Sequence, residues 1–253
     1  MTVRELYGYL NQMIPPALSC EWDNDGLMCC ADEDKEVHRV LITLDVTAEA
    51  VDLALREEYD VILSHHPMIF KGLKSINEEN YIADKVIRLI RGGVSVFSFH
   101  TRLDAVTGGV NDCLALLLGL ENVEPFGEEG IGRIGTLPEA TSAEGFAATV
   151  KKTLQAPYVN LGDAKRPVRR VAVLGGGGSD DVAAAFAAGA DTYVTGELKY
   201  HQLCDAPETG MNLIEAGHFF TEFPVTGVLA NLLTTIDPVI EYTIYNGNTV
   251  KTI

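Results

Sequence analysis

In "YDVILSHHPMIFKG", residues 59–72, a short apolar run leads directly into two histidines and a proline. The run "DVILS" has the length and apolar character of a buried strand. Before it come "VLITLDV", another buried strand, and "AEAVDLALREEY", a helix with Thr47 as its N-cap. A strand, a helix and a second strand in this order predict parallel pairing, because parallel strands need a crossover connection.

The same alternation continues in both directions along the chain. Thr2 and Glu5 have capping-box spacing at the start of a helix in "TVRELYGYLNQMIP". Toward the C-terminus, the pattern predicts a series of further helices and strands. The helices are "YIADKVIRLIRGG", "VNDCLALLLGL", "AEGFAATVKKTLQ", "SDDVAAAFAAGA", about 200–209 and "VTGVLANLLTTI"; the strands are "VSVFSFH", "RRVAVLGG", "DTYVTGE", "MNLIEAG" and "VIEYTIY".

The composition changes at "ENVEPFGEEGIGRIG", residues 121–135, which is rich in glycine, glutamate and proline. Such a stretch is typical of a domain junction. The sequence therefore predicts an α/β protein with two tandem domains and mostly parallel or mixed sheets. We expect one domain to comprise residues 1–126 and about 212–253, and the other to comprise about 127–211.

Charge and composition exclude several classes of function. The 253 residues are 47% hydrophobic, which is enough for real cores, and the formal net charge is −17. This charge repels nucleic acids, so no direct nucleic-acid binding is expected. The basic run "KRPVRR" fits a solvated edge before a strand better than a phosphate-binding patch. No run of about 18 apolar residues and no apolar secretion signal is seen, and the cysteines form no CxxC motif. A reduced, cytoplasmic protein without a membrane span is predicted.

Three predicted strands end by delivering imidazole or carboxylate groups. His65 and His66 follow "DVILS"; the strand "VSVFSF" runs into His100, with Asp104 four residues later. The strand "MNLIEA" is followed by "GHFFTEFP", which places His218 and Glu222 in a strand-to-helix turn. Functional groups gather beyond the carboxyl ends of parallel strands. These residues therefore predict a metal site.

The donor types indicate which metals are expected. Imidazole and carboxylate without thiolate suit Zn, Mn, Fe or Co better than Ca or Mg. Five or six ligands exceed the need of one tetrahedral ion, and a bridged pair of divalent ions would use them all. Because neighbouring side chains point apart on an extended backbone, His65 and His66 are expected to serve different ions.

Five motifs in this order resemble the Nif-three-like family of dinuclear metal proteins, also known as GTP cyclohydrolase I type 2. They are "WDNDGL", "SHHPMIF", "HTRLD" with "GGVND", "TGELKYH" and "EAGHFFTEFP", and they span residues 22–224. The resemblance implies two α/β domains with metals in the cleft between them, and a ring-shaped homohexamer. Arg102 departs from the pattern, where a smaller polar residue such as Asn is expected.

The resemblance also implies which residues hold the metals. Glu222 is implied as the bridge between the ions, and His100 and His201 are candidates for an additional ligand or a hydrogen-bonding group behind the ligands. Trp22 is implied to line the mouth of the cleft. The implied metal ligands are His65, His66, Asp104, His218 and Glu222.

Two classes of function remain open from the sequence. One is a metal-dependent hydrolase acting on a nucleotide-like or phosphorylated small molecule, with GTP as the substrate implied by the resemblance alone. The other is a non-catalytic metal-binding or interaction scaffold. A separate glycine-rich turn, "LGGGGSDD" at residues 174–181, fits a tight turn better than a phosphate cradle, because Asp180 and Asp181 oppose an anion.

Overall fold

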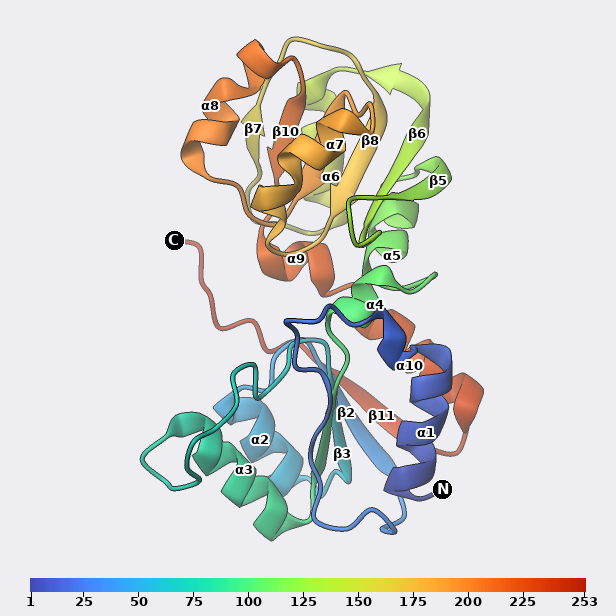
Figure 1. The fold of residues 1–253 in the computed structure, drawn as a ribbon, viewed down its shortest axis with the longest axis vertical. Helices are drawn as coiled ribbons and strands as arrows, with labels where there is room; N and C mark the ends of the chain where they lie inside the picture. The colour runs from blue at the N-terminus through green and yellow to red at the C-terminus, as the bar shows by residue number, and fades with distance from the viewer. The chain divides into compact units, whose positions relative to one another are not determined.

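The computed structural model describes residues 1–253 and divides into two compact units. Unit 1 comprises Met1–Val106 and Val225–Lys251, and unit 2 comprises Thr107–Pro224 with Thr252–Ile253. Each unit has a sheet of its own with helices packed on it (Figure 1). The α/β class with mixed sheets, predicted from the alternation of elements, is confirmed.

Unit 1 contains a five-stranded sheet in the order β1-β4-β3-β2-β11. The four strands from β4 to β11 pair in parallel, and β1 joins the edge antiparallel to β4. The strands are β1 (Gly26–Cys29), β2 (Arg39–Thr43), β3 (Val61–Ser64), β4 (Ser95–Ser98) and β11 (Glu241–Tyr245).

The helices of unit 1 cover both faces of this sheet. Helices α2 and α3 lie on one face and α1 and α10 on the other (Figure 1). The capping box predicted at Thr2 is present, since Glu5 N–H donates to Thr2 Oγ1 at 3.2 Å and Thr2 N–H donates to Glu5 Oε2 at 2.9 Å. The helices are α1 (Val3–Met13), the 3-10 turn η1 (Pro16–Leu18), α2 (Ala48–Arg56), α3 (Tyr81–Gly92), α4 (Thr101–Ala105) and α10 (Val225–Ile236).

Unit 2 contains a six-stranded sheet in the order β5-β6-β8-β9-β10-β7. Its centre, β8-β9-β10, is parallel, and the strands that flank it are antiparallel. The strands are β5 (Glu121–Phe126), β6 (Gly132–Thr141), β7 (Asn160–Gly162), β8 (Val168–Leu174), β9 (Thr192–Thr195) and β10 (Asn212–Glu215).

Alternation along the central strands of unit 2 sends side chains to two separate cores. Val171 and Val173 of β8 pack with α5 and α6, whereas Ala172 between them packs with α7 and α8. The sheet is therefore covered on both faces, as parallel sheets require. The helices are α5 (Val110–Leu117), α6 (Ala143–Thr153), the 3-10 turn η2 (Gly178–Asp181), α7 (Val182–Ala187), α8 (Tyr200–Thr209) and α9 (His218–Glu222).

The junctions between the units differ from the predicted boundaries at 126/127 and about 211/212. The glycine-rich stretch 121–135 is largely the hairpin β5–β6, in which Phe126 pairs with Gly132, so it lies inside the second sheet. Strand β10 also belongs to that sheet, because it pairs with β9. The chain instead passes from one unit to the other at Val106/Thr107 and at Pro224/Val225.

One helical stretch passes a length and composition test for a membrane span. It runs from His218 to Ile236, over α9 and α10, and 39% of the tested window is buried. A core helix of a globular protein passes the same test, so one such stretch is weak evidence for a membrane. The five cysteines are all free thiols.

Candidate metal centre

Strand β3 delivers the two adjacent histidines of unit 1. The parallel ladder continues past the strand, since His65 N–H donates to Thr43 O at 3.3 Å and His66 N–H donates to Leu44 O at 2.9 Å. His65 is fully buried and its Nδ1 lies 2.8 Å from Phe99 O. His66 is partly exposed and its Nδ1 lies 2.8 Å from Asp45 Oδ1. Backbone pairing and these contacts fix both rings.

Strand β4 delivers the next pair of candidate ligands through α4. His100 is the N-cap residue of α4, and Asp104 follows one turn later and is 8% exposed. Asp104 Oδ1 lies 3.7 Å from His65 Nε2. The ring of His100 lies 5.3 Å from that of His65 and 5.8 Å from that of His66. His65, His66 and His100 each offer a ligand atom within 4.8 Å of the others. The structure thus brings His100 into the histidine group of unit 1.

The two adjacent histidines diverge less than their spacing predicts. Their ring centroids are 5.0 Å apart, with an interplanar angle of 40°. The reason is that β3 ends at Ser64, so both residues lie in a bend rather than in extended strand. Their service of different ions stays a prediction.

His100 is held by the loop that carries the motif "WDNDGL". Its Nδ1 lies 2.9 Å from Asp23 Oδ1, and Thr101 donates to Asp23 Oδ2 from its backbone N–H at 3.0 Å and from Oγ1 at 2.6 Å. Burial acts to raise the pKa of Asp23, but the hydrogen bonds from His100 and Thr101 outweigh it and hold that pKa far below its usual value. Asp23 is therefore an anion that orients His100.

Arg102, the departure from the family pattern, faces the interior of unit 1. It is 1% exposed and donates through Nε to Asp25 Oδ2 at 3.1 Å and through Nη1 to Asn11 Oδ1 at 2.7 Å. Its guanidinium also lies 4.3 Å from the centroid of the Phe99 ring. The charge of Arg102 is thus committed to Asp25 and to α1.

Unit 2 supplies the remaining candidate ligands from α9. His218 and Glu222 lie one turn apart on this short helix, so the strand-to-helix turn that the sequence predicts is itself helical. One helical turn places both side chains on the same face. His218 Nε2 is 3.0 Å from Glu222 Oε2, and its Nδ1 is 2.8 Å from Glu197 Oε1 in the loop after β9. Glu222 is 4% exposed.

The glycine-rich turn after β8 makes room for Glu222. Gly176 has a φ of +69°, and a Cβ added to it would lie 2.1 Å from Glu222 Oε1. The amides of this turn are used internally: Gly175 N–H donates to Asn111 Oδ1 and Gly176 N–H donates to Thr221 Oγ1. The turn is therefore a support for α9, in agreement with a tight turn rather than a phosphate cradle.

The donor set of both units fits a divalent transition metal. Each of the four histidines has its Nδ1 against an oxygen acceptor, a carbonyl for His65 and a carboxylate for the other three. Nδ1 must then carry a proton, and in the neutral ring this leaves the lone pair on Nε2, the arrangement usual for metal-ligating histidines. The separations of 3.0 Å and 3.7 Å between a histidine Nε2 and a carboxylate oxygen are close to the spacing of about 3–3.5 Å between two ligands of one ion bound at 2.0–2.2 Å.

Sequence reasoning missed the carboxylates behind the histidines. Asp23 and Glu197 lie within the quoted motifs "WDNDGL" and "TGELKYH", and Asp45 lies in "VLITLDV". Each of these stretches contains a carboxylate that was not among the predicted metal ligands, and this could have indicated a supporting role. The candidate His201, by contrast, is exposed on α8 and is not among the residues whose ligand atoms converge.

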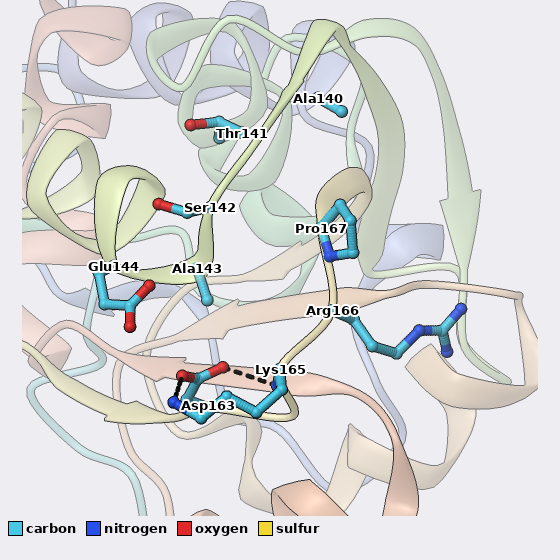
Figure 2. A pocket seen from close by; sticks show the side chains of 9 residues that line it. All are labelled: Ala140, Thr141, Ser142, Ala143, Glu144, Asp163, Lys165, Arg166 and Pro167. Atoms are coloured by element: carbon cyan, nitrogen blue, oxygen red, sulfur yellow. Dashed lines mark hydrogen bonds and ion pairs between the residues drawn. The ribbon is translucent and has the colours of Figure 1, made fainter.

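The basic run before β8 borders a hollow of about 480 Å³ in unit 2, formed with the N-terminus of α6 (Figure 2). Lys165 bonds to Asp163, and Arg166, whose side chain extends away from that pair, donates to Gly210 O at 2.8 Å (Figure 2). Arg170 bonds to Glu124 Oε1 at 2.7 Å. The basic side chains therefore bond to acceptors of the protein itself. This agrees with the interpretation of the run as the edge of a strand and not as a phosphate-binding patch.

Fold and site together define a class: a two-unit α/β protein in which both units present histidine and carboxylate groups that could bind a metal. The family model described as Duf34/NIF3 (NGG1p interacting factor 3) matches residues 1–249, and the chain belongs to this family. The resemblance seen in the sequence motifs is thereby confirmed.

Curated relatives and solved structures agree with this assignment. The chain is 30% identical over 241 residues to a "GTP cyclohydrolase 1 type 2 homolog" of Clostridium acetobutylicum, covering 92% of this chain and 90% of the relative. A hypothetical protein of Staphylococcus aureus has a TM-score of 0.89 and 28% identity, covering 100% of this chain and 99% of the other. Reduced HcgD from Methanocaldococcus jannaschii has a TM-score of 0.86 and 28% identity, with 97% and 98% covered.

Proposed function

We propose that the protein is a dinuclear-metal hydrolase acting on a phosphorylated or nucleotide-like small molecule. The observation that carries the proposal is the common hydrogen bonding of the four histidines. Each has its Nδ1 bonded to an oxygen, so its Nε2 can offer a lone pair to a metal. The proposed ions are two divalent metals, with Zn, Mn, Fe or Co as the candidates. The ligands are His65, His66, Asp104, His218 and Glu222.

The chain's residues have separate tasks in this proposal. Bound ions supply Lewis acidity and an activated water at neutral pH. His65 and His66 hold fixed Nε2 donors because backbone pairing positions them, and Asp45 keeps His66 in the required tautomer. Glu222, buried and with two carboxylate oxygens, would hold both ions, because an anion offsets the repulsion between two nearby dications. His100, whose ring lies 5.3 Å from that of His65, is proposed to complete the set or to orient a ligand from behind it.

The substrate is proposed as a chemical class. The names of the relatives point to GTP, and ring opening of GTP is one hydrolysis that this chemistry would support. No residue described here reads a guanine base, so the proposal extends to phosphorylated and nucleotide-like molecules in general. Bound dications would offset the repulsion of a phosphate by a chain of net charge −17.

The test is a two-site metal titration of the wild type and of Glu222→Gln. Glutamine keeps the shape but removes the charge, so we expect the second ion to weaken by more than the about 10–100-fold typical of outer-shell changes, and the first ion much less. Asp104→Asn should weaken mainly one ion. The matched control is Glu215→Gln, whose carboxylate accepts from Asn160 Nδ2 at 2.7 Å, and its titration should match that of the wild type. Unchanged affinities in Glu222→Gln would reject the bridging role.

A metabolite panel separates catalysis from a metal-binding scaffold. Zn- or Mn-loaded protein should hydrolyse at least one phosphorylated or nucleotide-like compound, and Glu222→Gln should lose that turnover together with the second ion. Two bound ions with no turnover across the panel would support the scaffold instead.

We also propose a cytoplasmic homo-oligomer, with a hexamer as the expected state, on the family resemblance alone. Multi-angle light scattering at micromolar concentration is the measurement. A monomer mass of 27.4 kDa would reject it.

A further inference from the structure

Two exposed aromatic side chains lie beside the histidine group of unit 1. Trp22 is 59% exposed and Phe70 is 44% exposed, and their ring centroids are 6.3 Å apart. Both also contact His100, at 6.3 Å for Trp22 and 6.1 Å for Phe70. The two rings therefore border the side chains that the proposed function assigns to the metals.

The backbone that carries Trp22 is firmly anchored, although its indole is exposed. Two residues before it, Cys20 N–H donates to Thr101 Oγ1 at 3.0 Å. Directly after it, Asp23 binds His100 and Thr101. Exposure of the indole is thus not the result of a loose loop.

Phe70 is tied to the same anchor. Asn24 Nδ2 donates to Ile69 O, the carbonyl directly before Phe70. This bond links the loop of Trp22 to the loop that follows His65 and His66. The backbones that carry the two aromatic rings are therefore linked to each other as well as the rings themselves.

We propose that Trp22 and Phe70 form a stacking subsite for a planar aromatic or heteroaromatic ring of the substrate. An exposed indole loses contact with water favourably when a ring covers it, and a ring stacked on fixed aromatic side chains gains affinity without ordering them first. The subsite borders His100, so a ring bound there has its substituents beside the histidine group. This inference rests on the proposed function and narrows its substrate class to molecules with a planar ring.

The sole tryptophan of the chain gives a direct readout, because Trp22 is the only source of indole fluorescence. The probes are the four nucleoside 5′-monophosphates, with ribose 5-phosphate as the match that lacks the aromatic base, titrated into metal-free and into Zn-loaded protein. We expect at least one nucleotide to quench the fluorescence of Trp22 in a saturable way, and ribose 5-phosphate to leave it unchanged.

Variants separate stacking from general binding. Phe70→Leu should weaken the quenching nucleotide by about 5- to 150-fold, the range that stacking on one aromatic side chain supplies. Trp22→Leu, followed by calorimetry since its probe is lost, should do the same. Tyr81→Leu is the matched control, because Tyr81 is 75% exposed on α3 of the same unit. This variant should bind the quenching nucleotide with the affinity of the wild type. Circular dichroism and metal stoichiometry confirm that each variant folds and loads.

The outcomes distinguish the subsite from the hydrolase. Saturable quenching that Phe70→Leu weakens supports the subsite, even if no compound is turned over and the hydrolase proposal fails. No quenching by any nucleotide, equal binding of ribose 5-phosphate, or unchanged affinity in Phe70→Leu would overturn the subsite. Turnover of phosphates without an aromatic ring would then leave the hydrolase proposal standing.

Discussion

The two units use the same strand–helix framework but end their strands in different chemistry. In unit 1 the parallel strands β2, β3 and β4 alternate with α2 and α3, and in unit 2 the parallel strands β8, β9 and β10 alternate with α7 and α8. At the carboxyl ends, unit 1 presents three histidines and an aspartate, whereas unit 2 presents one histidine, two glutamates and a glycine turn.

At the amino ends of their parallel strands, the two units share the same pattern of hydrogen bonds. Asp60, directly before β3, accepts from the N–H groups of His38 and Arg39 at 2.8 and 3.0 Å. Asp191, directly before β9, accepts from those of Arg169 and Arg170 at 2.9 and 2.8 Å. One end of the framework is thus repeated as scaffold, and the other end is free to differ because side chains beyond the strands do not hold the sheet together.

The largest expected effect comes from the buried arginine of each unit. Arg102 in unit 1 bonds to Asp25, and Arg133 in unit 2 bonds to Asp112 at 2.8 and 3.2 Å. Replacing Arg102 by methionine leaves the buried Asp25 carboxylate without its cation, so we expect unit 1 to lose about 3–5 kcal/mol of its free energy of unfolding. The Asp112 side chain is 24% exposed, so Arg133→Met should cost unit 2 less.

Urea unfolding followed by two signals assigns each loss to a unit. Trp22 fluorescence reports unit 1, and far-ultraviolet circular dichroism reports both. Arg102→Met should shift the fluorescence transition, and Arg133→Met should shift circular dichroism more than fluorescence. Identical shifts of both signals in both variants would show that the units unfold as one.

The next effect concerns Gly176, whose lack of a side chain leaves room for Glu222. Gly93 at the end of α3 and Gly176 after β8 have φ values of +67° and +69°. Alanine at either position should destabilise by about 1–2 kcal/mol through its left-handed backbone. At Gly176 the added Cβ also meets Glu222, so a further loss of about 1–3 kcal/mol is expected.

Metal titration separates these two glycines further. Gly176→Ala should weaken metal binding because it displaces Glu222, whereas Gly93→Ala should not, since the nearest atom to its Cβ is Lys35 Nζ at 3.9 Å. Equal metal affinity in the two variants would mean that Gly176 does not define the position of Glu222.

Asp60 and Asp191 test whether the two units gain similar stability from the hydrogen bonds that they share. Asp60→Asn and Asp191→Asn should each cost about 1.5–3 kcal/mol, the contribution of hydrogen bonds to a charged group. Asp60 also pairs with Lys35 at 2.9 Å, so its replacement should have the larger effect. Urea unfolding of both variants is the measurement, and a larger loss for Asp191→Asn would break the comparison.

The stabilisation by Asp60 should also depend on pH. Burial acts to raise the pKa of Asp60, but the Lys35 side chain and the amides of His38 and Arg39 lower it below the ordinary value. The stabilisation is therefore present above the unfolded pKa of about 3.9 and is lost as the pH falls through the lower folded pKa. The free energy of unfolding of the wild type, followed by Trp22 fluorescence, should decrease as the pH is lowered below about 4. That of Asp60→Asn should decrease less.

The smallest effect is expected at the helix caps. Thr47 Oγ1 accepts from Ala50 N–H at 3.1 Å at the start of α2, and Ser142 Oγ accepts from Gly145 N–H at 3.1 Å at the start of α6. Thr47→Ala and Ser142→Ala should each cost about 1 kcal/mol. Thermal unfolding of both should show similar small decreases, and a large decrease in one would indicate a role beyond capping.

Local sequence patterns predict the elements and the donor types. Apolar runs and caps located β3, β4, α2 and α10 closely, because burial on both faces of a parallel sheet leaves a continuous apolar run. The sequence also determined that imidazole and carboxylate follow three strands, because motif order is a property of the chain.

Which residues act together is visible only in the folded chain. The hairpin β5–β6 reads as a linker, because glycine and glutamate are common in both, and only pairing with β8 shows that it belongs to unit 2. The convergence of His65, His66 and His100, and the roles of Asp23 and Glu197 behind their histidines, depend on contacts between segments far apart in the chain. Periodicity records which face a side chain takes, but not which distant loop meets it.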